Sequence, residues 1–176
     1  MRFFRWLFPA TLTLVMLLQL NSMDTALRTP ETPWGMIGYQ LAFTPERAAD
    51  MLAVWKSRDL FETLRVSLGF DGFFLVVYPL FLSISVKGLL GSTRLAARRL
   101  LIRSGSVLRW LVLFCIPLDA MENVLLWIMM DSTPGTAFTL STGVMASSKF
   151  LLVVITLGWC LSALVLRQLS PAPGKA

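Results

Sequence analysis

Acidic side chains interrupt an apolar stretch of the chain at a spacing that could support chemistry. In LDAMENVLLW, residues 118–127, Asp119, Glu122 and Asn123 occupy positions i, i+3 and i+4, which share one face of a helix. An ionisable group inside a membrane span costs at least about 2.5–3.5 kcal/mol and by default indicates a functional site. This segment therefore predicts an acidic site within a membrane-spanning helix.

A second apolar stretch places polar side chains at a compatible depth. In SLGFDGFFLVVYPLFL, Tyr78 follows Asp71 by seven residues, so both lie on one helical face, two turns apart. We expect a helical bundle to bring Asp71, Tyr78, Asp119, Glu122 and Asn123 together as an interior ligand-binding site that opens outward. The sequence assigns a catalytic role to none of them.

The elements that position these residues follow from composition. The chain of 176 residues is 56% hydrophobic and 15% charged, against about 45–50% and about 25% in soluble domains. Crossing a hydrocarbon core of about 30 Å takes roughly 20 apolar residues. We therefore predict an all-α, polytopic four-helix bundle that forms one membrane domain. Its parts are spans near residues 4–20, 67–87, 110–130 and 149–166, an outer loop at 21–66 and a basic loop at 88–109.

The first span has some features of a signal peptide. Arg2 and Arg5 precede the apolar stretch LFPATLTLVMLLQL, as in the basic start of such a peptide. The following segment NSMDTALR offers no small-x-small cleavage motif. This favours an uncleaved first helix over a cleaved signal.

The basic loop predicts the orientation of the bundle. It carries five arginines and no acid, and loops rich in bases stay in the cytoplasm. Both termini are then cytoplasmic as well. The loop is also typical of a short amphipathic helix on anionic headgroups, so the excess of bases requires no nucleic-acid partner. The arginines are Arg94, Arg98, Arg99, Arg103 and Arg109, and Lys87 precedes them.

The outer loop contains a predicted helix in FTPERAADMLAVW. Thr44 can cap it, Pro45 suits its first position and Glu46 suits the positive N-terminal end. The pattern favours a helix that lies on the outer membrane surface or over the mouth of the bundle, with Trp55 as an interfacial anchor. Its apolar residues share one side at helical spacing: Ala48, Met51, Leu52 and Trp55.

Few bases are expected near the buried acids. Arg65 is predicted at the outer mouth, while Lys87 and Arg109 are predicted at the cytoplasmic end, more than two turns from Asp119. Simple ion pairs are therefore not expected to neutralise the site. Three explanations remain open: a carboxylate is protonated, a cation or cationic ligand supplies the charge, or water reaches the acids.

Three functions are compatible with this pattern. The first is a protein whose acidic site binds or passes a cation, a proton or an amphiphilic ligand with a basic or hydroxylated head. The second is a structural or accessory membrane subunit, in which the acids form a polar network that locks the helices together. The third is a lipid-modifying enzyme that uses two carboxyl groups as acid and base.

The same composition limits cofactors and partners. The chain has no histidine and two cysteines, Cys115 and Cys160, both in apolar stretches without metal-ligand spacing. We predict no metal and no cofactor, and we expect the cysteines to be packing residues. The expected partners are the lipid bilayer, a small cationic or amphiphilic ligand, and a membrane-protein partner or a second copy. Gly69, Gly72 and Gly158 are predicted to permit close helix packing.

Three segments together resemble a group of small four-span bacterial inner-membrane proteins with no assigned activity. The segments are YQLAFTPERAADMLAVW, SLGFDGFFLVVYPLFL and LDAMENVLLW, within residues 39–127. The resemblance implies a multi-pass protein of the bacterial plasma membrane. The architecture is also similar, by analogy alone, to the sterol isomerase and sigma-2 receptor superfamily. The matching positions are Tyr39, Leu41, Ala42, Trp55, Asp71, Phe74, Tyr78, Asp119, Glu122 and Asn123.

Overall fold

The computed structural model describes residues 2–92 and 98–169 and has an all-α fold, as predicted. No strand occurs in these two ranges. Arg94 of the basic loop and the C-terminal tail SPAPGKA lie outside the described residues. The helices are α1 (Arg2–Leu27), α2 (Gly35–Gln40), α3 (Pro45–Ser57), α4 (Phe61–Leu90), α5 (Arg99–Leu111), the 3-10 helix η2 (Val112–Phe114), α6 (Cys115–Asp131) and α7 (Thr136–Leu169).

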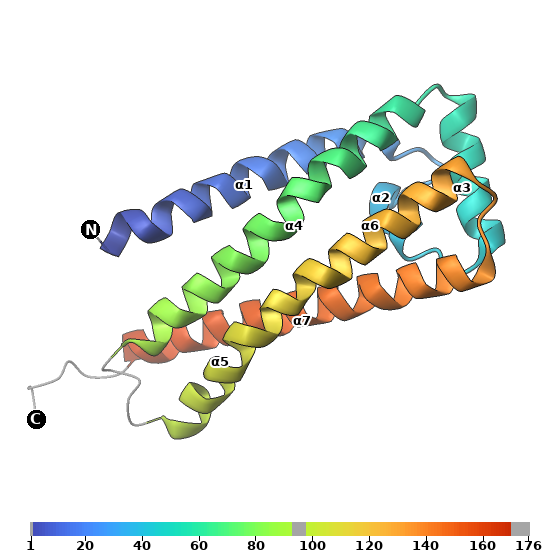
Figure 1. The fold of residues 1–176 in the computed structure, drawn as a ribbon. Coiled ribbons are helices and arrows are strands. Elements are labelled where there is room, and N and C mark those ends of the chain that lie inside the picture. Colours follow the sequence, from blue (N-terminus) through green and yellow to red (C-terminus); the bar gives the residue numbers. More distant parts are fainter. Residues whose placement is uncertain (1, 93–97, 170–176) are drawn as a thin grey trace, which may run out of the picture.

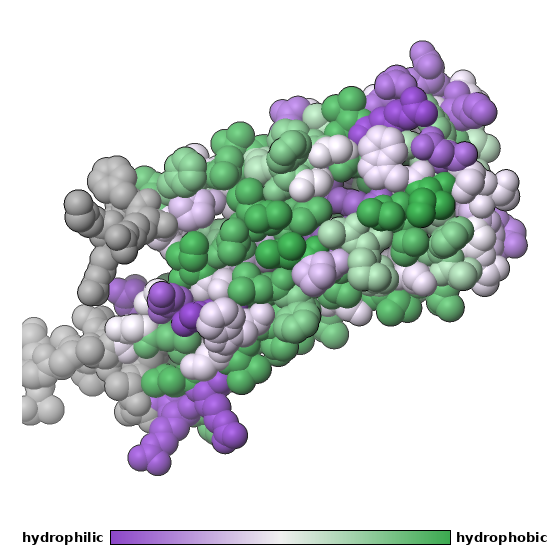
Figure 2. Space-filling model, viewed as in Figure 1, coloured by the Kyte–Doolittle hydropathy of each residue, from purple (hydrophilic) through white to green (hydrophobic). Residues whose placement is uncertain are grey.

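Long apolar helices form the body of the fold (Figure 1). Within the described residues, four segments are long and apolar enough to cross a membrane: Trp6–Leu27, Phe61–Leu90, Arg99–Asp131 and Thr136–Leu169. The helix α1 begins and α7 ends at one end of the bundle, and α2 and α3 lie at the opposite end (Figure 1). Figure 2 shows hydrophobic side chains along the middle of the visible face and hydrophilic ones toward its ends. This distribution fits a multi-pass membrane protein.

The third span is a continuous run of helix from α5 through η2 to α6. The short 3-10 turn has a local cause in Pro117, because proline has no N–H to donate to the carbonyl four residues earlier and its ring crowds that carbonyl. That carbonyl belongs to Leu113, within Val112–Phe114, where the helix tightens. The turn therefore separates the basic helix α5 from the membrane helix α6.

The helices extend beyond the predicted spans, most of all in α7. Hydropathy predicted a span at 149–166, whereas α7 begins at Thr136. Its first turns are rich in serine and threonine, but these hydroxyls donate to carbonyls one turn back. Thr142 Oγ1 donates to Phe138 O and Ser147 Oγ to Gly143 O, at 2.8 and 2.7 Å. The polar groups are thus satisfied within the helix, which places Lys149 well inside α7.

The helix α3 begins as predicted. Thr44 has extended backbone, and its side chain accepts a hydrogen bond from the Arg47 N–H at 3.4 Å. Pro45 occupies the first helical position. The helix ends at Ser57, and α4 begins at Phe61 after a short break with Asp59 in the left-handed region, at φ 58°. Residues 21–66, which were predicted as an outer loop, are therefore largely helical.

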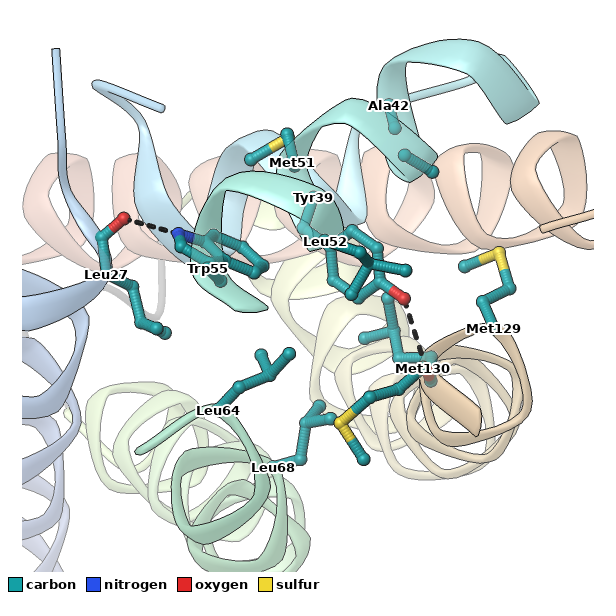
Figure 3. Packing of buried hydrophobic residues seen from close by; sticks show 12 residues of the cluster. Leu27, Tyr39, Ala42, Met51, Leu52, Trp55, Leu64, Leu68, Met129 and Met130 are labelled. Atoms are coloured by element: carbon teal, nitrogen blue, oxygen red, sulfur yellow. Dashed lines mark hydrogen bonds between the residues drawn. The ribbon is translucent and has the colours of Figure 1, made fainter. Parts of the chain in front are cut away.

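The apolar face of α3 turns inward and closes one end of the bundle (Figure 3). Trp55 is fully buried, and its Nε1–H donates to Leu27 O at 2.8 Å and to Thr32 Oγ1 at 3.2 Å. The interpretation of Trp55 as an interfacial anchor is therefore wrong, because its ring packs among Leu64 and Leu68 of α4 rather than at the lipid surface. Of the two predicted positions for α3, the mouth of the bundle is the correct one.

Tyr39 of α2 also packs into this closed end of the bundle. We call the part formed by α2 and α3 over the ends of α4 and α6 the α2–α3 cap. Its ring meets Trp55 edge-on at 5.6 Å between centroids, and its hydroxyl donates to Leu126 O at 3.3 Å. Burial raises the pKa of the Tyr39 phenol, so the hydroxyl stays protonated and remains a donor. The contact ties α2 to α6, two segments far apart in the sequence.

The close approach of α5 and α7 depends on Gly105, for which the sequence predicted no packing role. A Cβ on Gly105 would lie 2.2 Å from the Trp159 ring, whereas a Cβ on Gly69, Gly72 or Gly158 would meet nothing within 4 Å. The prediction that these three glycines permit close packing is therefore wrong. The contact forms instead where α5 crosses α7.

Replacing Gly105 with alanine should destabilise the protein by about 1–3 kcal/mol, the usual effect of overpacking a tight contact. Thermal unfolding in detergent micelles would measure the loss. The matched variant Gly158→Ala adds the same methyl group where space is open, and it should change the melting temperature little. Equal effects of the two substitutions would contradict the assigned contact.

Candidate functional site

The acidic face of α6 points into the bundle. Asp119, Glu122 and Asn123 are all buried, with Glu122 fully so. At 1.5 Å per residue, Glu122 and Asp119 lie roughly 14 and 18 Å from the end of α6 at Asp131. That depth is close to the middle of a hydrocarbon core of about 30 Å.

The structure adds a base that the sequence analysis missed. Lys149 of α7 forms an ion pair with Asp119, and its Nζ lies 2.9 Å from Glu122 Oε2. The expectation that simple ion pairs do not neutralise the site is therefore wrong for Asp119 and Glu122. The predicted span began at residue 149, where lysine is an ordinary flanking residue. Because α7 starts at Thr136, Lys149 lies more than three turns inside the helix.

Tyr78 joins a third helix to this ion pair. Its hydroxyl donates to Asp119 Oδ2 at 2.6 Å, while Lys149 donates to Oδ1 of the same carboxylate. Asp119 thus receives a hydrogen bond from α4 and an ion pair from α7. Each of these contacts holds a polar group that would otherwise face hydrocarbon, and together they connect α4, α6 and α7.

Asp71 and Asn123 form a second linked pair. Asn123 Nδ2 donates to Asp71 Oδ2 at 2.9 Å. Asp71 is only partly buried, unlike the three polar residues of α6. Among the described residues Asp71 has no ion-pair partner within 4.0 Å. The five residues predicted as a site therefore form two pairs, Tyr78–Asp119 and Asp71–Asn123, and Glu122 is connected to the first pair through Lys149.

The buried charges and polar atoms of the site are not fully balanced. The carboxyl groups of Asp119 and Glu122 both pair with the ammonium of Lys149, and the Asp71 carboxyl lines the same cavity. Both Glu122 oxygens and Asn123 Oδ1 are buried without a hydrogen-bond partner among the described residues. Lys149 Nζ is close enough to Glu122 for charge attraction, but it is not aligned as a hydrogen-bond donor. Buried polar atoms without partners are rare and call for an explanation.

Two adjoining cavities lie beside this site, between α1 and α7. The larger has a volume of about 400 Å³ and is lined by Asp71, Tyr78, Asp119 and Lys149 among apolar side chains. The smaller, of about 190 Å³, continues toward Asp24 and Arg28 at the end of α1. Three residues line both cavities: Leu17, Asp71 and Phe150. We call the two cavities together the α1–α7 groove.

The groove results from how α1 is attached. This helix packs mainly along α4, and near its start Trp6 Nε1 donates to Ser85 Oγ of α4 at 3.0 Å. Leu17 of α1 and Leu157 of α7 are both about half exposed on the two sides of the groove, at 50% and 51%. The groove is thus accessible from the side of the bundle that faces lipid.

The described residues give no indication of a metal-binding site. They contain no group of three histidine, cysteine or acidic side chains placed to hold a metal ion. Lys149 occupies the position between Asp119 and Glu122 that a bound cation would need. Both cysteines are free, and Cys115 is buried within the apolar cluster of Tyr78, Leu82 and Val112.

Comparisons with protein-family models, with curated proteins and with solved structures found no match to this chain. Function must therefore be argued from the site itself.

Proposed function

We propose that the protein binds an amphiphile whose amine or hydroxyl head contacts Asp71 and whose apolar tail lies in the α1–α7 groove. One observation carries this proposal. Asp71 lines both cavities and accepts a hydrogen bond from Asn123, yet it forms no ion pair within 4.0 Å among the described residues, because Lys149 in the same cavity lining is paired with Asp119 and Glu122. One hydrogen bond, to Oδ2, leaves the other acceptor sites of this carboxylate unused beside an apolar groove, and a cationic or hydroxylated head supplies a further donor.

The size and composition of the groove favour an amphiphile over a metal ion or a proton. Ligand pockets are typically about 300–1,000 Å³ and are lined mainly by apolar side chains with a few placed polar groups. The larger cavity, of about 400 Å³, has this character. A proton path requires no such volume. The accessible side of the groove would admit the ligand directly from the bilayer.

Three probes with the same twelve-carbon tail test the head group: dodecylamine, dodecanol and dodecanoate. We expect dodecylamine, and more weakly dodecanol, to raise the melting temperature of the purified protein in maltoside micelles. At a concentration a hundredfold above Kd, binding stabilises by about 2.7 kcal/mol. Dodecanoate should have no effect, because its carboxylate would face Asp71.

Two variants locate the binding. Asp71→Asn should abolish the response to dodecylamine, whereas the control Glu62→Gln changes an exposed acid of the same helix and should retain it. Leu17→Trp should weaken the response to both the amine and the alcohol, because the larger ring fills the groove without touching an acid. An unchanged response in Asp71→Asn and Leu17→Trp would exclude this site.

A second function is favoured by the contacts of Asp119. Its bonds to Tyr78 and Lys149 connect three helices, as expected of a structural or accessory subunit whose acids lock the bundle. In that case none of the three probes would bind, and Asp71→Asn would lower the melting temperature. The third possibility, a lipid-modifying enzyme with paired carboxyls, is disfavoured because Lys149 lies between Asp119 and Glu122.

We also propose that this is a bacterial inner-membrane protein with the α5 end in the cytoplasm. The support is the charge of the loop that contains α5, which has bases and no acid, as cytoplasmic loops do. A cysteine accessibility assay in intact cells would test this orientation at Arg47 and Arg99. Labelling of Arg99→Cys but not Arg47→Cys by an impermeant reagent would reverse it.

A further inference from the structure

The two ends of the bundle differ in how their arginines are neutralised. At the end that carries α2 and α3, three of the four arginines, Arg28, Arg58 and Arg65, pair with acids, and Arg47 does not. At the α5 end, Arg99 and Arg103 are exposed, and they form no ion pair with any described residue. The sequence explains the difference, because residues 72–118 contain no acid.

The helix α5 holds these arginines at a fixed position. Gly105 lies against the Trp159 ring of α7. Trp159 Nε1 contacts Leu101 O and Ser104 Oγ of α5, both at 3.1 Å. Arg99 and Arg103 are four residues apart and share one helical face. Two unpaired guanidinium groups are thus presented side by side from a helix that is docked on the bundle.

An apolar groove adjoins these charges. It has a volume of about 440 Å³ and runs between α5 and α7, where Arg103 and Ser104 meet Leu100, Val107 and Ile155. Leu100 and Val107 are 86% and 52% exposed. We call this the α5–α7 groove. It places a guanidinium group beside a surface suited to a hydrocarbon chain.

The length of the third span places α5 in the headgroup layer. Arg99–Asp131 comprises 33 residues and is roughly 50 Å long at 1.5 Å per residue. A hydrocarbon core of about 30 Å accommodates only part of it. With Asp131 at the opposite surface, the arginine-bearing turns of α5 are expected among the headgroups, and Figure 1 shows α5 at the end of the bundle opposite α2 and α3. Figure 2 shows hydrophilic side chains projecting from this end of the molecule.

We propose that the α5–α7 groove is a binding site for an anionic phospholipid. The lipid phosphate pairs with Arg99 and Arg103, and one acyl chain lies along Leu100, Val107 and Ile155. Charge complementarity identifies the occupant, because unpaired guanidinium groups bind phosphate well and clusters of bases at this depth attract anionic headgroups. This site is separate from Asp71 and does not depend on the proposed function.

Binding of three probes to the purified full chain in maltoside micelles tests this site. The probes are dioleoyl-phosphatidylglycerol, dioleoyl-phosphatidylcholine and inorganic phosphate, and binding is followed by native mass spectrometry and by melting temperature. We expect the phosphatidylglycerol to bind and stabilise, and the phosphatidylcholine to do so much more weakly. Arg99→Gln with Arg103→Gln should weaken phosphatidylglycerol binding about ten- to thirtyfold, at roughly three- to fivefold per lost base.

Matched variants separate this site from diffuse charge attraction. Arg47→Gln with Lys56→Gln removes two exposed bases from α3 and should leave binding unchanged. Val107→Trp keeps the charge but fills the α5–α7 groove, so it should weaken binding. Equal losses in both double-charge variants, or unchanged binding in Val107→Trp, would overturn the proposal. Inorganic phosphate that competes fully with the lipid would show a free-anion site instead.

Discussion

Trp55→Ala is expected to destabilise the protein by about 3–5 kcal/mol, the range for removing a large aromatic side chain from a core. Trp55 has no exposed surface, and its indole N–H is bonded to Leu27 O and Thr32 Oγ1. The substitution would leave a cavity at the centre of the α2–α3 cap and remove the indole hydrogen bonds to Leu27 O and Thr32 Oγ1, each of which keeps one other donor. Stepwise titration with a denaturing detergent, which unfolds the protein, would measure the change in the free energy of unfolding.

Trp34→Ala is the matched control for this prediction. Trp34 lies in the same outer region but is 67% exposed, so its loss should change stability by no more than about 0.5 kcal/mol. If Trp55→Ala and Trp34→Ala had similar small effects, α3 would not be packed over the bundle as described. The earlier interpretation of Trp55 as a surface anchor would then regain support.

Lys149→Met is expected to be equally severe, at about 3–5 kcal/mol, because it leaves buried acids without their cation. Methionine keeps an unbranched apolar side chain, so the main loss is the charge. Asp119 and Glu122 would both lose the one ion-pair partner that the described part of the chain gives them. The same substitution at exposed Lys56 is the control, and it should be nearly neutral by thermal unfolding.

A double-mutant cycle would show that the effect belongs to the ion pair. Asp119→Asn removes a charge and keeps the shape of the side chain, so combining it with Lys149→Met should recover part of the lost stability. Residues in contact typically show coupling of about 0.5–3 kcal/mol. Strict additivity of the two substitutions would mean that Lys149 and Asp119 do not interact in the folded protein.

The number of membrane spans and the all-α class could be predicted from the sequence, because both depend on local properties, whereas the short helix α2 was not predicted. Apolar runs of sufficient length predicted the spans, and the cap at Thr44 and the proline at position 45 predicted the start of α3. Helical spacing alone also predicted which residues share a face with Asp119 on α6 and with Tyr78 on α4.

The pairing within the site depended on distant parts of the chain. Lys149 was missed because hydropathy started the fourth span at that residue, although the serines and threonines before it extend the helix back to Thr136 by bonding to their own backbone. One signal could have revealed it. A single lysine stands directly before a long apolar run, and the small residues in front of it can continue the same helix. Similarly, the burial of Trp55 depends on α3 folding back over the bundle, which no local pattern specifies.

The grooves were beyond prediction for a further reason. Each depends on the space between helices that are not adjacent in sequence, namely α1 with α7 and α5 with α7. Spacing along one helix fixes which residues share a face, but it does not fix how far that face lies from another helix. Gly105 illustrates the point, because its role exists only through the Trp159 ring on the other helix.

The short connection between α6 and α7 bears on how the chain enters a membrane. Only residues 132–135 separate the two helices, while α6 carries Asp119 and Glu122 and α7 carries Lys149. Inserted singly, each helix would bring its charges into hydrocarbon at roughly 2.5–3.5 kcal/mol per central charge. Inserted as a hairpin, the two helices carry partly compensating charges from the start. The ion pair that connects them in the folded protein therefore also favours their insertion as one unit.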